Sequence, residues 1–551
     1  MRVGLLAVAL FSSAVIGEND VRIRGSNKDY RPGDWITFST TRFIRSVSIG
    51  QECIYFATTG GICRYNFFRN GWESPWTVSS GLADNDVKIA ALDNNTGYVW
   101  AVTERAICYL DPASNYWTNA YFDELGIFPA KISAVGFSDD RQVYLLTSRQ
   151  EVLVSEAYGA FFSRVDAIDF SKEIIWHSEK AQSAVDMPTF FMPMHYLFDA
   201  DELTVDDGRL RSWPLTAWAE DSWQNLWIGT WGLGAGRGNL QNYNLEMLPF
   251  GLWSSKVGAI AVDGDRLWLA GAQTDPQTSG ITVWNPGEGE PEYFEPRLIT
   301  GFYQDEISSI AVDGETVWFG SRGGLTRYDR QKQIWRTCTQ VDNLIDDWVQ
   351  DIVVDDSSIW VATAGGVSRV VKKTVGTDSL QIRPVMHAAL SNLFIYDLEK
   401  QENLLWIATE FGIYVYDIAT GEGGFFKGAA GPSNQETYAI SSFGDEIWFA
   451  TEEGVAALDS QKKEWLPPPA RLYESNLRVY RLLADEYGVW AATADGVRRF
   501  DRRSDRWIHY GVEDGLPASA IYAICLDEDY IWFGGEGGLT LFYWNSPGRI
   551  D

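Results

Sequence analysis

Histidine is scarce in this chain of 551 residues, and no histidine pattern points to a metal site or a catalytic base. The four His stand far apart and fit neither HExxH nor another zinc-ligand spacing. A GxSxG nucleophile motif is also missing, and the glycine-rich stretch Gly234–Gly238 lacks the strand-to-helix context of a phosphate-binding loop. The sequence therefore favours a non-enzymatic function.

Basic residues are also few, because 45 Lys and Arg stand against 75 Asp and Glu and give a formal charge of −30. Such a charge keeps a protein soluble and makes nucleic acids and anionic membrane surfaces poor partners. The acidic turns are either a solvated surface or a binding region for cations. The turn Asp263-Gly264-Asp265 lacks the spaced Glu of an EF-hand. We therefore expect no cofactor and leave calcium open.

A long apolar run is found only at the N-terminus, in Met1–Gly17. This stretch has the length and small-residue end of a secretory signal, although a buried or disordered N-terminal strand is the alternative. No later segment approaches the 18 apolar residues of a membrane span. We expect the mature chain to stay out of the membrane and to be periplasmic, exposed on the cell surface or secreted.

Cysteine is rare and odd in number, with five in the whole chain. Cys53 and Cys63 flank the first predicted hairpin and could pair in an oxidising compartment. The alternative is that the cysteines are small buried hydrophobic residues.

The chain is rich in a repeat of about 40 to 45 residues, best seen in Thr316–Trp335. Its most regular feature is a Trp followed by an apolar and then a small residue, and we call this Trp the anchor. Tyr takes its place in two weaker copies. The spacing is doubled once, between Tyr144 and Trp227, and predicts a twelfth copy near Met194–Phe198. The anchors are Tyr55, Trp100, Tyr144, Trp227, Trp268, Trp318, Trp360, Trp406, Trp448, Trp490 and Trp532.

Alternating aromatic and β-branched residues around each anchor, ended by Gly pairs, predict short antiparallel strands. Four such strands in about 40 residues are typical of a β-propeller blade, which must stack on its neighbours to bury its faces. The sequence predicts an all-β fold with about twelve four-stranded blades. Because a propeller usually has about four to eight blades, two six- or seven-bladed propellers are expected.

The two ends of the chain predict how the propellers are connected. Asp34–Phe38 resembles the outer strand of a blade, whereas the last unit stops after its third strand, so the N-terminal strand is expected to close the last blade. This closure requires one propeller to be inserted in the other, with crossings at Arg209–Asn225 and Pro467–Pro469. The expected parts are a signal peptide 1–17, a linker 18–33, a first propeller 34–215 and 470–551, and an inserted second propeller 216–469.

Trp448–Val455 and Trp507–Trp532 resemble the two-component regulator propeller repeat. The resemblance covers most of the chain after residue 34 and is weak between Gln150 and Asp221. It implies paired propellers like those in the extracytoplasmic sensor part of hybrid histidine kinases, which are thought to perceive glycan breakdown products. Related double propellers occur in cell-surface assembly proteins. The sequence holds no kinase module, so we expect only the binding role to carry over, with a separate signalling or assembly partner.

A non-repetitive region between Trp176 and Trp231 holds the candidate binding residues. Aromatic side chains with polar neighbours suit stacking on sugars or on the apolar surface of a partner. The alternative is that they pack the junction between the two rings. The candidates are Trp213, Trp218, Trp223, Trp231, Phe190, Phe191 and His195.

The function that these observations favour is a non-enzymatic binding or sensor-type double propeller that recognises a glycan or an envelope protein. Two alternatives stay open. One is a propeller enzyme of the glycosidase or lyase type that uses carboxylates, which needs acid pairs at defined separations. The other is a subunit of a cell-surface assembly.

Overall fold

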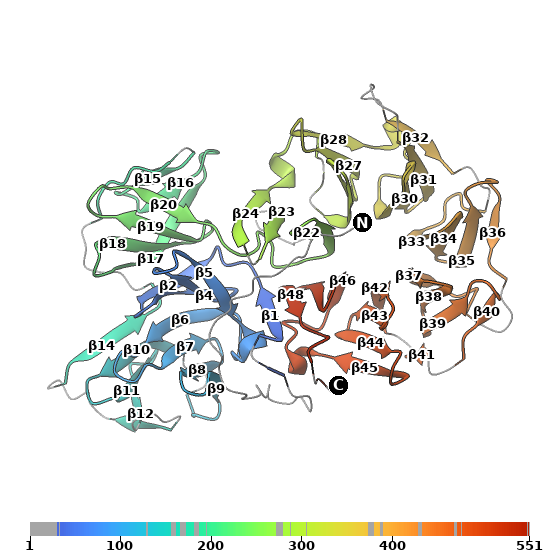
Figure 1. Ribbon diagram of the computed structural model, residues 1–551. Coiled ribbons are helices and arrows are strands. Elements are labelled where there is room, and N and C mark those ends of the chain that lie inside the picture. Colours follow the sequence, from blue (N-terminus) through green and yellow to red (C-terminus); the bar gives the residue numbers. More distant parts are fainter. Residues whose placement is uncertain are drawn as a thin grey trace. The chain divides into compact units, whose positions relative to one another are not determined.

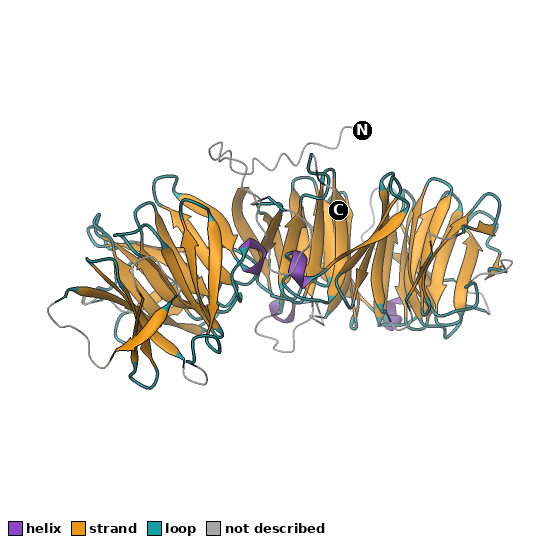
Figure 2. Ribbon diagram, turned by 90° about the horizontal axis from the view of Figure 1, so that it is seen from below, coloured by secondary structure: helices purple, strands orange, loops and turns teal. Residues whose placement is uncertain are grey.

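The computed structural model describes residues 30–549 except 32, 128–130, 156–160, 166–171, 181–186, 194, 272–278, 287, 303, 305, 373–379, 386–388, 428–431, 468–470, 475–476 and 548. The predicted signal peptide 1–17 lies outside the described residues. Strands make up nearly all of the regular structure, as Figure 2 shows. Four short 3-10 helices accompany them: η1 (Val78–Ser80), η2 (Pro296–Leu298), η3 (Gln340–Asp342) and η4 (Val512–Asp514). Among the described residues no helix is long and apolar enough to cross a membrane.

The chain forms two compact units, which meet in the sequence between Leu252 and Trp253. We call them the N-terminal and the C-terminal unit. Eleven antiparallel sheets are described in all, and most have four strands in chain order. The all-β, multi-blade propeller fold that the repeat predicts is therefore confirmed.

The C-terminal unit contains seven sheets arranged around a centre (Figure 1). The innermost strands of successive sheets contact one another, and β46 contacts β21, so the ring closes. The first four sheets are β21 (Ala259–Asp263), β22 (Arg266–Gly271), β23 (Gly280–Asn285), β24 (Glu288–Phe294); β25 (Ile307–Asp313), β26 (Thr316–Ser321), β27 (Gly324–Asp329), β28 (Ile334–Cys338); β29 (Val349–Val354), β30 (Ser358–Thr363), β31 (Gly366–Val371), β32 (Gln381–Pro384); and β33 (Ile395–Gln401), β34 (Leu404–Thr409), β35 (Gly412–Asp417), β36 (Gly423–Phe425).

The other three sheets of this ring follow the same pattern. They are β37 (Thr437–Phe443), β38 (Glu446–Thr451), β39 (Gly454–Asp459), β40 (Glu464–Trp465), β41 (Leu472–Tyr473); β42 (Val479–Ala484), β43 (Gly488–Thr493), β44 (Val497–Asp501), β45 (Arg506–Tyr510); and β46 (Ile521–Asp527), β47 (Tyr530–Gly535), β48 (Gly538–Phe542). The last sheet has the strand order β1-β48-β47-β46, with β1 (Trp35–Phe38) as its outer strand, as the sequence predicts.

The N-terminal unit contains four sheets, of which two have extra strands. They are β2 (Ile44–Ile49), β3 (Cys53–Thr58), β4 (Gly61–Asn66), β5 (Gly71–Trp76); β6 (Val87–Leu92), β7 (Val99–Thr103), β8 (Ala106–Asp111), β9 (Tyr116–Tyr121); β10 (Ile132–Ser138), β11 (Val143–Thr147), β12 (Val152–Ser155), β13 (Phe162–Val165), β14 (Ile174–Ser178); and β15 (Leu197–Asp199), β16 (Thr204–Asp206), β17 (Ser212–Glu220), β18 (Asn225–Thr230), β19 (Ala235–Asn239), β20 (Leu245–Leu248).

The predicted twelfth copy near Met194–Phe198 does not form a sheet of its own. β15 and β16 instead extend the sheet that holds Trp227, in the order β15-β16-β17-β18-β19-β20. β14 pairs with β10 and widens the preceding sheet on its inner side. The described part of the doubled spacing is therefore filled by additional strands of two existing sheets, and the described residues form seven sheets in the C-terminal unit and four in the N-terminal unit.

The division of the chain also differs from the predicted insertion of 216–469. Pro467–Pro469 was expected to mark a crossing between rings. In the structure β40 and β41 lie on either side of these prolines and both pair with β39. Pro468 and Pro469 lie outside the described residues, and after β41 the chain continues into β42 of the next sheet of the same unit.

Nine of the eleven anchors lie on the strand that follows the innermost strand of their sheet, whereas Tyr144 lies on β11 and Trp227 on β18 of the two sheets with additional strands. All eleven are buried, with 0–9% of their surface exposed. The turn before the anchor strand often supplies an acceptor for the indole N–H. Trp360 donates to Asp355 Oδ2 at 3.1 Å, and Asp355 Oδ1 accepts the backbone N–H of Ser357 and Ser358. Burial would raise the pKa of Asp355, but the bonds from Trp360 and Ser357 outweigh it and leave the pKa below its usual value.

In most sheets a Thr or Ser hydroxyl closes the hairpin that follows the anchor strand. The buried Thr363 hydroxyl donates to the carbonyl oxygen of Gly366 at 2.8 Å, and Thr409 makes the same bond to Gly412 at 2.7 Å. Gly366 has a φ of +135°, which a residue with a Cβ rarely adopts. The predicted tight glycine turns are present, and the Thr hydroxyl is the part of the turn that the glycine pattern alone did not reveal.

The five cysteines are free thiols. Cys53 lies opposite Asn66 and Cys63 lies opposite Phe56 in the β3–β4 pair, so the two are in different registers and the Cys53–Cys63 disulfide does not form. Burial raises the pKa of the Cys63 thiol to about 12. The alternative reading, that these residues are small buried hydrophobic side chains, describes Cys53, Cys63, Cys108 and Cys338.

Replacing one anchor should destabilise the C-terminal unit strongly. We expect Trp360→Ala to lower the free energy of unfolding by about 3–5 kcal/mol, because the side chain is fully buried and leaves a large cavity. Chemical denaturation followed by far-UV circular dichroism measures this loss. Trp348→Ala is the control in the same unit, since Trp348 is 37% exposed, and an equal loss in both variants would contradict the assigned role of the anchor.

Candidate functional site

The seven predicted contact residues do not lie on one surface. Phe190 and Trp218 belong to the hydrophobic core of the β15–β20 sheet, where Phe190 packs edge-on against Phe198 at 5.5 Å between ring centroids. Trp213 is 9% exposed and its indole N–H donates to Asp207 Oδ2 at 3.2 Å. These three side chains pack the sheet internally and are not available to stack on a ligand.

The other four predicted residues are exposed and lie at different places. Trp231 follows the end of β18 and packs edge-on against Phe43, with the Arg45 guanidinium 5.2 Å from its ring centroid. Trp223 lies before the other end of β18 and is 51% exposed. His195 is exposed, in a turn with a φ of +83°.

Phe191, the last of the four, is 70% exposed and is held beside β20 by backbone bonds. Its N–H donates to the Tyr243 carbonyl at 2.7 Å, and its own carbonyl accepts from Leu245 N–H at 2.9 Å. Phe190, the preceding residue, is only 4% exposed. The extended backbone therefore turns one ring into the core and presents the next to solvent.

Phe191 forms one side of an open groove of about 620 Å³ along β18, β19 and β20. Because β18 and β19 are antiparallel, Asn225 at the start of β18 lies opposite Asn239 at the end of β19. The turn from β19 to β20 adds Asn242 and Asn244. We call this the asparagine groove.

Local hydrogen bonds explain why this turn is rich in Asn. Asn239 Oδ1 accepts the backbone N–H of Gln241 and Asn242, both at 3.0 Å, and Asn242 Oδ1 accepts that of Asn244 at 3.0 Å. Asn side chains favour such turns because they bond to the backbone two residues on. The side-chain NH2 groups of Asn242 and Asn244 have no partner within the described part of the chain.

Arg237 provides the positive charge of the groove and is held in place by its neighbours. Its Nε donates to Glu246 Oε1 at 2.9 Å, and its Nη1 donates to Asn70 Oδ1 at 2.8 Å. The guanidinium also lies 5.6 Å from the centroid of the buried Trp227 ring. The groove therefore combines amide groups, a fixed guanidinium and an exposed aromatic ring.

This combination is suited to sugars. Amide groups both donate to and accept from hydroxyl groups, and an aromatic face packs against the C–H side of a sugar ring. In the sequence the amide groups appear as Asn239-Leu240-Gln241-Asn242-Tyr243-Asn244, a pattern that aromatic content alone does not reveal.

The buried acids of the C-terminal unit have a different arrangement. Asp351 on β29, Asp397 on β33 and Arg481 on β42 occupy the same position of their strands, at the register shift with the anchor strand. Arg481 forms ion pairs with Asp351 Oδ1 at 3.0 Å and with Asp397 Oδ1 at 2.5 Å. We call these three residues the charge clasp, because they join three sheets of the ring.

The two carboxylates of the clasp are almost closed to solvent, since the side chains of Asp351 and Asp397 are 11% and 6% exposed. Asp397 Oδ2 also accepts the backbone N–H of Ile440 at 2.8 Å. Burial raises the pKa of Asp397 well above its usual value, while Arg481 opposes this shift. These carboxylates hold the sheets together, so they do not offer an open acid–base pair to a substrate.

Four tyrosines occupy the second position of their inner strands, one residue before the position that Asp397 and Arg481 take. Tyr396, Tyr438, Tyr480 and Tyr522 recur every 42 residues, and the rings of Tyr396 and Tyr438 pack edge-on at 5.4 Å. The Tyr438 hydroxyl donates to Glu436 Oε2 at 3.1 Å. The Arg478 guanidinium lies 3.7 Å from the centroid of the Tyr438 ring. The tyrosines therefore contact one another and the neighbouring Glu436 and Arg478. Their spacing of 42 residues is the spacing of the anchors, so the anchor pattern alone does not distinguish them.

No group of three or more His, Cys, Asp or Glu is placed to hold a metal ion within the ranges that the structure describes. His387 lies outside these ranges. The expectation of no resident cofactor, with calcium left open, stays a prediction.

Comparison with known proteins adds support for the fold. No protein-family model and no curated protein matches the chain. The structure of PorZ, described as an essential bacterial surface component of the type-IX secretion system of Porphyromonas gingivalis, is similar with a TM-score of 0.59 and 13% identity, over 93% of this chain and 87% of that chain. The extracellular domain of the putative hybrid two component system BT4673 from B. thetaiotaomicron aligns with a TM-score of 0.46 and 15% identity, over 91% and 70% of the two chains.

Removing the cation of the clasp should destabilise the C-terminal unit in a pH-dependent way. Arg481→Met leaves two buried carboxylates facing each other, and we expect a loss of about 3–5 kcal/mol in the free energy of unfolding at neutral pH. The folded pKa of Asp397 then lies still further above the unfolded value of about 4, so the folded state binds more protons than the unfolded state.

The unfolding free energy of Arg481→Met should therefore rise as the pH falls from 7 toward about 5. Urea denaturation at several pH values measures this slope against the wild-type protein. The double variant Arg481→Met with Asp397→Asn is the control, and it should recover part of the stability and lose most of the extra slope. A variant that is as stable as the wild type at pH 7 would contradict the clasp.

Proposed function

We propose that this chain is an extracytoplasmic, non-enzymatic binding protein that recognises a neutral glycan through the asparagine groove. The observation that carries the proposal is the exposed Phe191 ring beside Asn242, Asn244 and Arg237 in an open groove of about 620 Å³. Binding sites of this kind combine an apolar platform with a few polar groups that fix the orientation of the ligand.

The charge of the protein supports a neutral ligand. With a net charge of −30, the chain repels polyanions at long range, whereas a neutral glycan gains from local hydrogen bonds and stacking alone. The groove itself is locally balanced, because Arg237 is paired with Glu246.

The extracytoplasmic location rests on the N-terminal apolar run and on likeness of fold. PorZ is a bacterial surface component, and a similar location for this chain fits the signal-like stretch Met1–Gly17. A glycosidase or lyase would need an open pair of acids, and Asp351 and Asp397 do not supply one, because both are buried in the charge clasp.

Docking of an envelope protein is a second candidate, supported by the aromatic residues at the neighbouring edge of the same unit. Phe68 is 69% exposed and Trp223 is 51% exposed, and their ring centroids lie 6.3 Å apart. Exposed aromatic pairs of this kind act as anchors in protein interfaces. A protein subunit of a surface assembly would use this edge and leave the groove free.

Removing the aromatic platform should weaken glycan binding without unfolding the protein. We expect Phe191→Ala to reduce the affinity for a bound neutral oligosaccharide by about tenfold, which corresponds to about 1.4 kcal/mol. Isothermal titration calorimetry with cellohexaose, xylohexaose and mannohexaose measures this change. Thermal unfolding serves as the check that the variant is folded.

The matched control is Phe161→Ala, which removes another highly exposed Phe of the N-terminal unit away from the groove. It should bind as the wild type does. Equal affinities of the Phe191 and Phe161 variants, or no binding of any of these sugars by the wild type, would contradict the glycan proposal. Loss of a co-purifying envelope protein in Trp223→Ala would then support the second candidate.

A further inference from the structure

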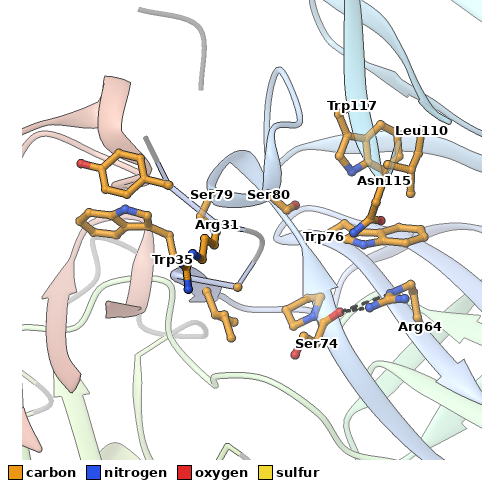
Figure 3. Close-up of a pocket in the computed structure, with 14 residues that line it drawn as sticks. Arg31, Trp35, Arg64, Ser74, Trp76, Ser79, Ser80, Leu110, Asn115 and Trp117 are labelled. Atoms are coloured by element: carbon orange, nitrogen blue, oxygen red, sulfur yellow. Dashed lines mark hydrogen bonds between the residues drawn. The ribbon is translucent and has the colours of Figure 1, made fainter. Parts of the chain in front are cut away.

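A second, more enclosed cavity, of about 160 Å³, is lined by residues between Tyr30 and Trp117 and lies apart from the asparagine groove. Its walls come from the end of β5, from η1, from β8 and β9, and from the segment that leads into β1 (Figure 3). The backbone N–H of Thr37 on β1 donates to the Ser79 hydroxyl of η1 at 3.1 Å, which fixes this segment against the rest of the wall.

Two tryptophans form the apolar part of the cavity. Trp76 and Trp117 meet edge-on, with ring centroids 5.4 Å apart and planes at 80°, as Figure 3 shows. The Arg64 guanidinium packs on the face of the Trp76 ring, 4.1 Å from the ring centroid. Arg64 is itself paired with Glu73 at 2.7 Å and bonded to the Ser74 carbonyl at 2.8 Å, so its charge is used within the wall.

Trp117 carries the observation that points to a ligand. It is 6% exposed and lines the cavity, yet its indole N–H has no acceptor within the described ranges of the chain. Burying such a donor without a partner destabilises the protein, so nearly all buried donors bond to protein, to water or to a ligand. Asn115 lies beside it in Figure 3 and offers both a donor and an acceptor.

Arg31 brings a positive charge to the rim. The backbone N–H of Arg31 donates to Asp34 Oδ2 at 2.7 Å, and the backbone N–H of Asp34 donates to the Arg31 carbonyl at 3.0 Å. These two bonds fix the turn between Arg31 and Asp34. The guanidinium is exposed and forms no ion pair with any residue that the structure describes.

We propose that this cavity binds a small cyclic carboxylate, of the size of a hexuronic acid or a benzoic acid. The ring of the ligand packs between Trp76 and Trp117, its oxygen atoms accept from the Trp117 indole N–H, and its carboxylate pairs with Arg31. Drug-sized ligands occupy cavities of about 300–1,000 Å³, so a volume of about 160 Å³ limits the occupant to a molecule of single-ring size. This site takes an anion, and it stands independently of the neutral glycan proposed for the groove.

The test compares each acid with its uncharged counterpart on the mature protein. The probes are glucuronate, benzoate and cyclohexanecarboxylate, each set against glucose, benzyl alcohol and cyclohexylmethanol. Binding is followed by calorimetry and by the intrinsic fluorescence of tryptophan. At least one acid should bind at least about tenfold more tightly than its neutral counterpart, because an ionic hydrogen bond is gained only by the acid.

Two variants separate the contributions of the charge and of the indole donor. Arg31→Gln should remove the preference for the acid, and Trp117→Phe should weaken both members of the pair while keeping an apolar ring in the wall. Arg149→Gln is the matched control, an exposed arginine of the same unit outside the cavity, and it should bind as the wild type does.

Three outcomes would overturn the proposal: no acid binds more tightly than its neutral counterpart, Arg31→Gln keeps the full preference, or Trp117→Phe binds as well as the wild type. The Phe191→Ala variant is expected to bind the acids normally. The failure of the groove and the failure of this cavity are therefore distinguishable.

Discussion

The structure depends on the burial of one large aromatic side chain in the second strand of each blade. A blade cannot bury both of its faces alone, so its stability comes from packing on its neighbours. A Trp removes roughly 150–250 Å² from water, which at about 25 cal/mol per Å² stabilises the fold by about 4–6 kcal/mol. Trp100, Trp318, Trp406 and Trp490 bury an indole N–H that has no acceptor among the described residues. At about 1–3 kcal/mol each, that cost is smaller than the gain, so burial of the ring decides the anchor position.

The elements that could be predicted from the sequence are those that repeat. The anchors, the glycine turns and the all-β fold follow from residue spacing and strand alternation, and the structure confirms them. The number of sheets could not be predicted in this way, because spacing does not reveal which sheet a strand joins. The chain between Tyr144 and Trp227 is long enough for two blades, yet β14, β15 and β16 add to existing sheets. Pro467–Pro469 suggested a crossing for the same reason, because the sequence pattern does not reveal that the strands on either side, β40 and β41, pair with the same strand, β39.

Of the seven predicted contact residues, Phe191 lines the asparagine groove, whereas its neighbour Phe190 lies in the hydrophobic core. The sequence treats Phe190 and Phe191 alike, but neighbouring residues of an extended strand point to opposite sides, and their exposures are 4% and 70%. Aromatic content alone could not separate core from surface in a chain with 25 Trp and 28 Phe. The Asn residues of the β19–β20 turn are the better signal, because polar side chains in a turn stay near solvent whatever the core requires. The cavity at Trp117 left no pattern, since its walls come from segments far apart in the chain.

The sites that remain as candidates for function lie where the repeat is broken. The seven-sheet ring is the most regular part of the molecule, and its inner strands use their charged side chains on one another, as Arg481 does with Asp351 and Asp397. A repeated position that must pack against a neighbouring blade has little freedom to bind anything else. The groove adjoins a sheet that has two additional strands, and the cavity is walled by the segment that precedes the first blade. In such places the side chains do not have to satisfy a neighbouring copy of the repeat, so their polar groups are available to a ligand.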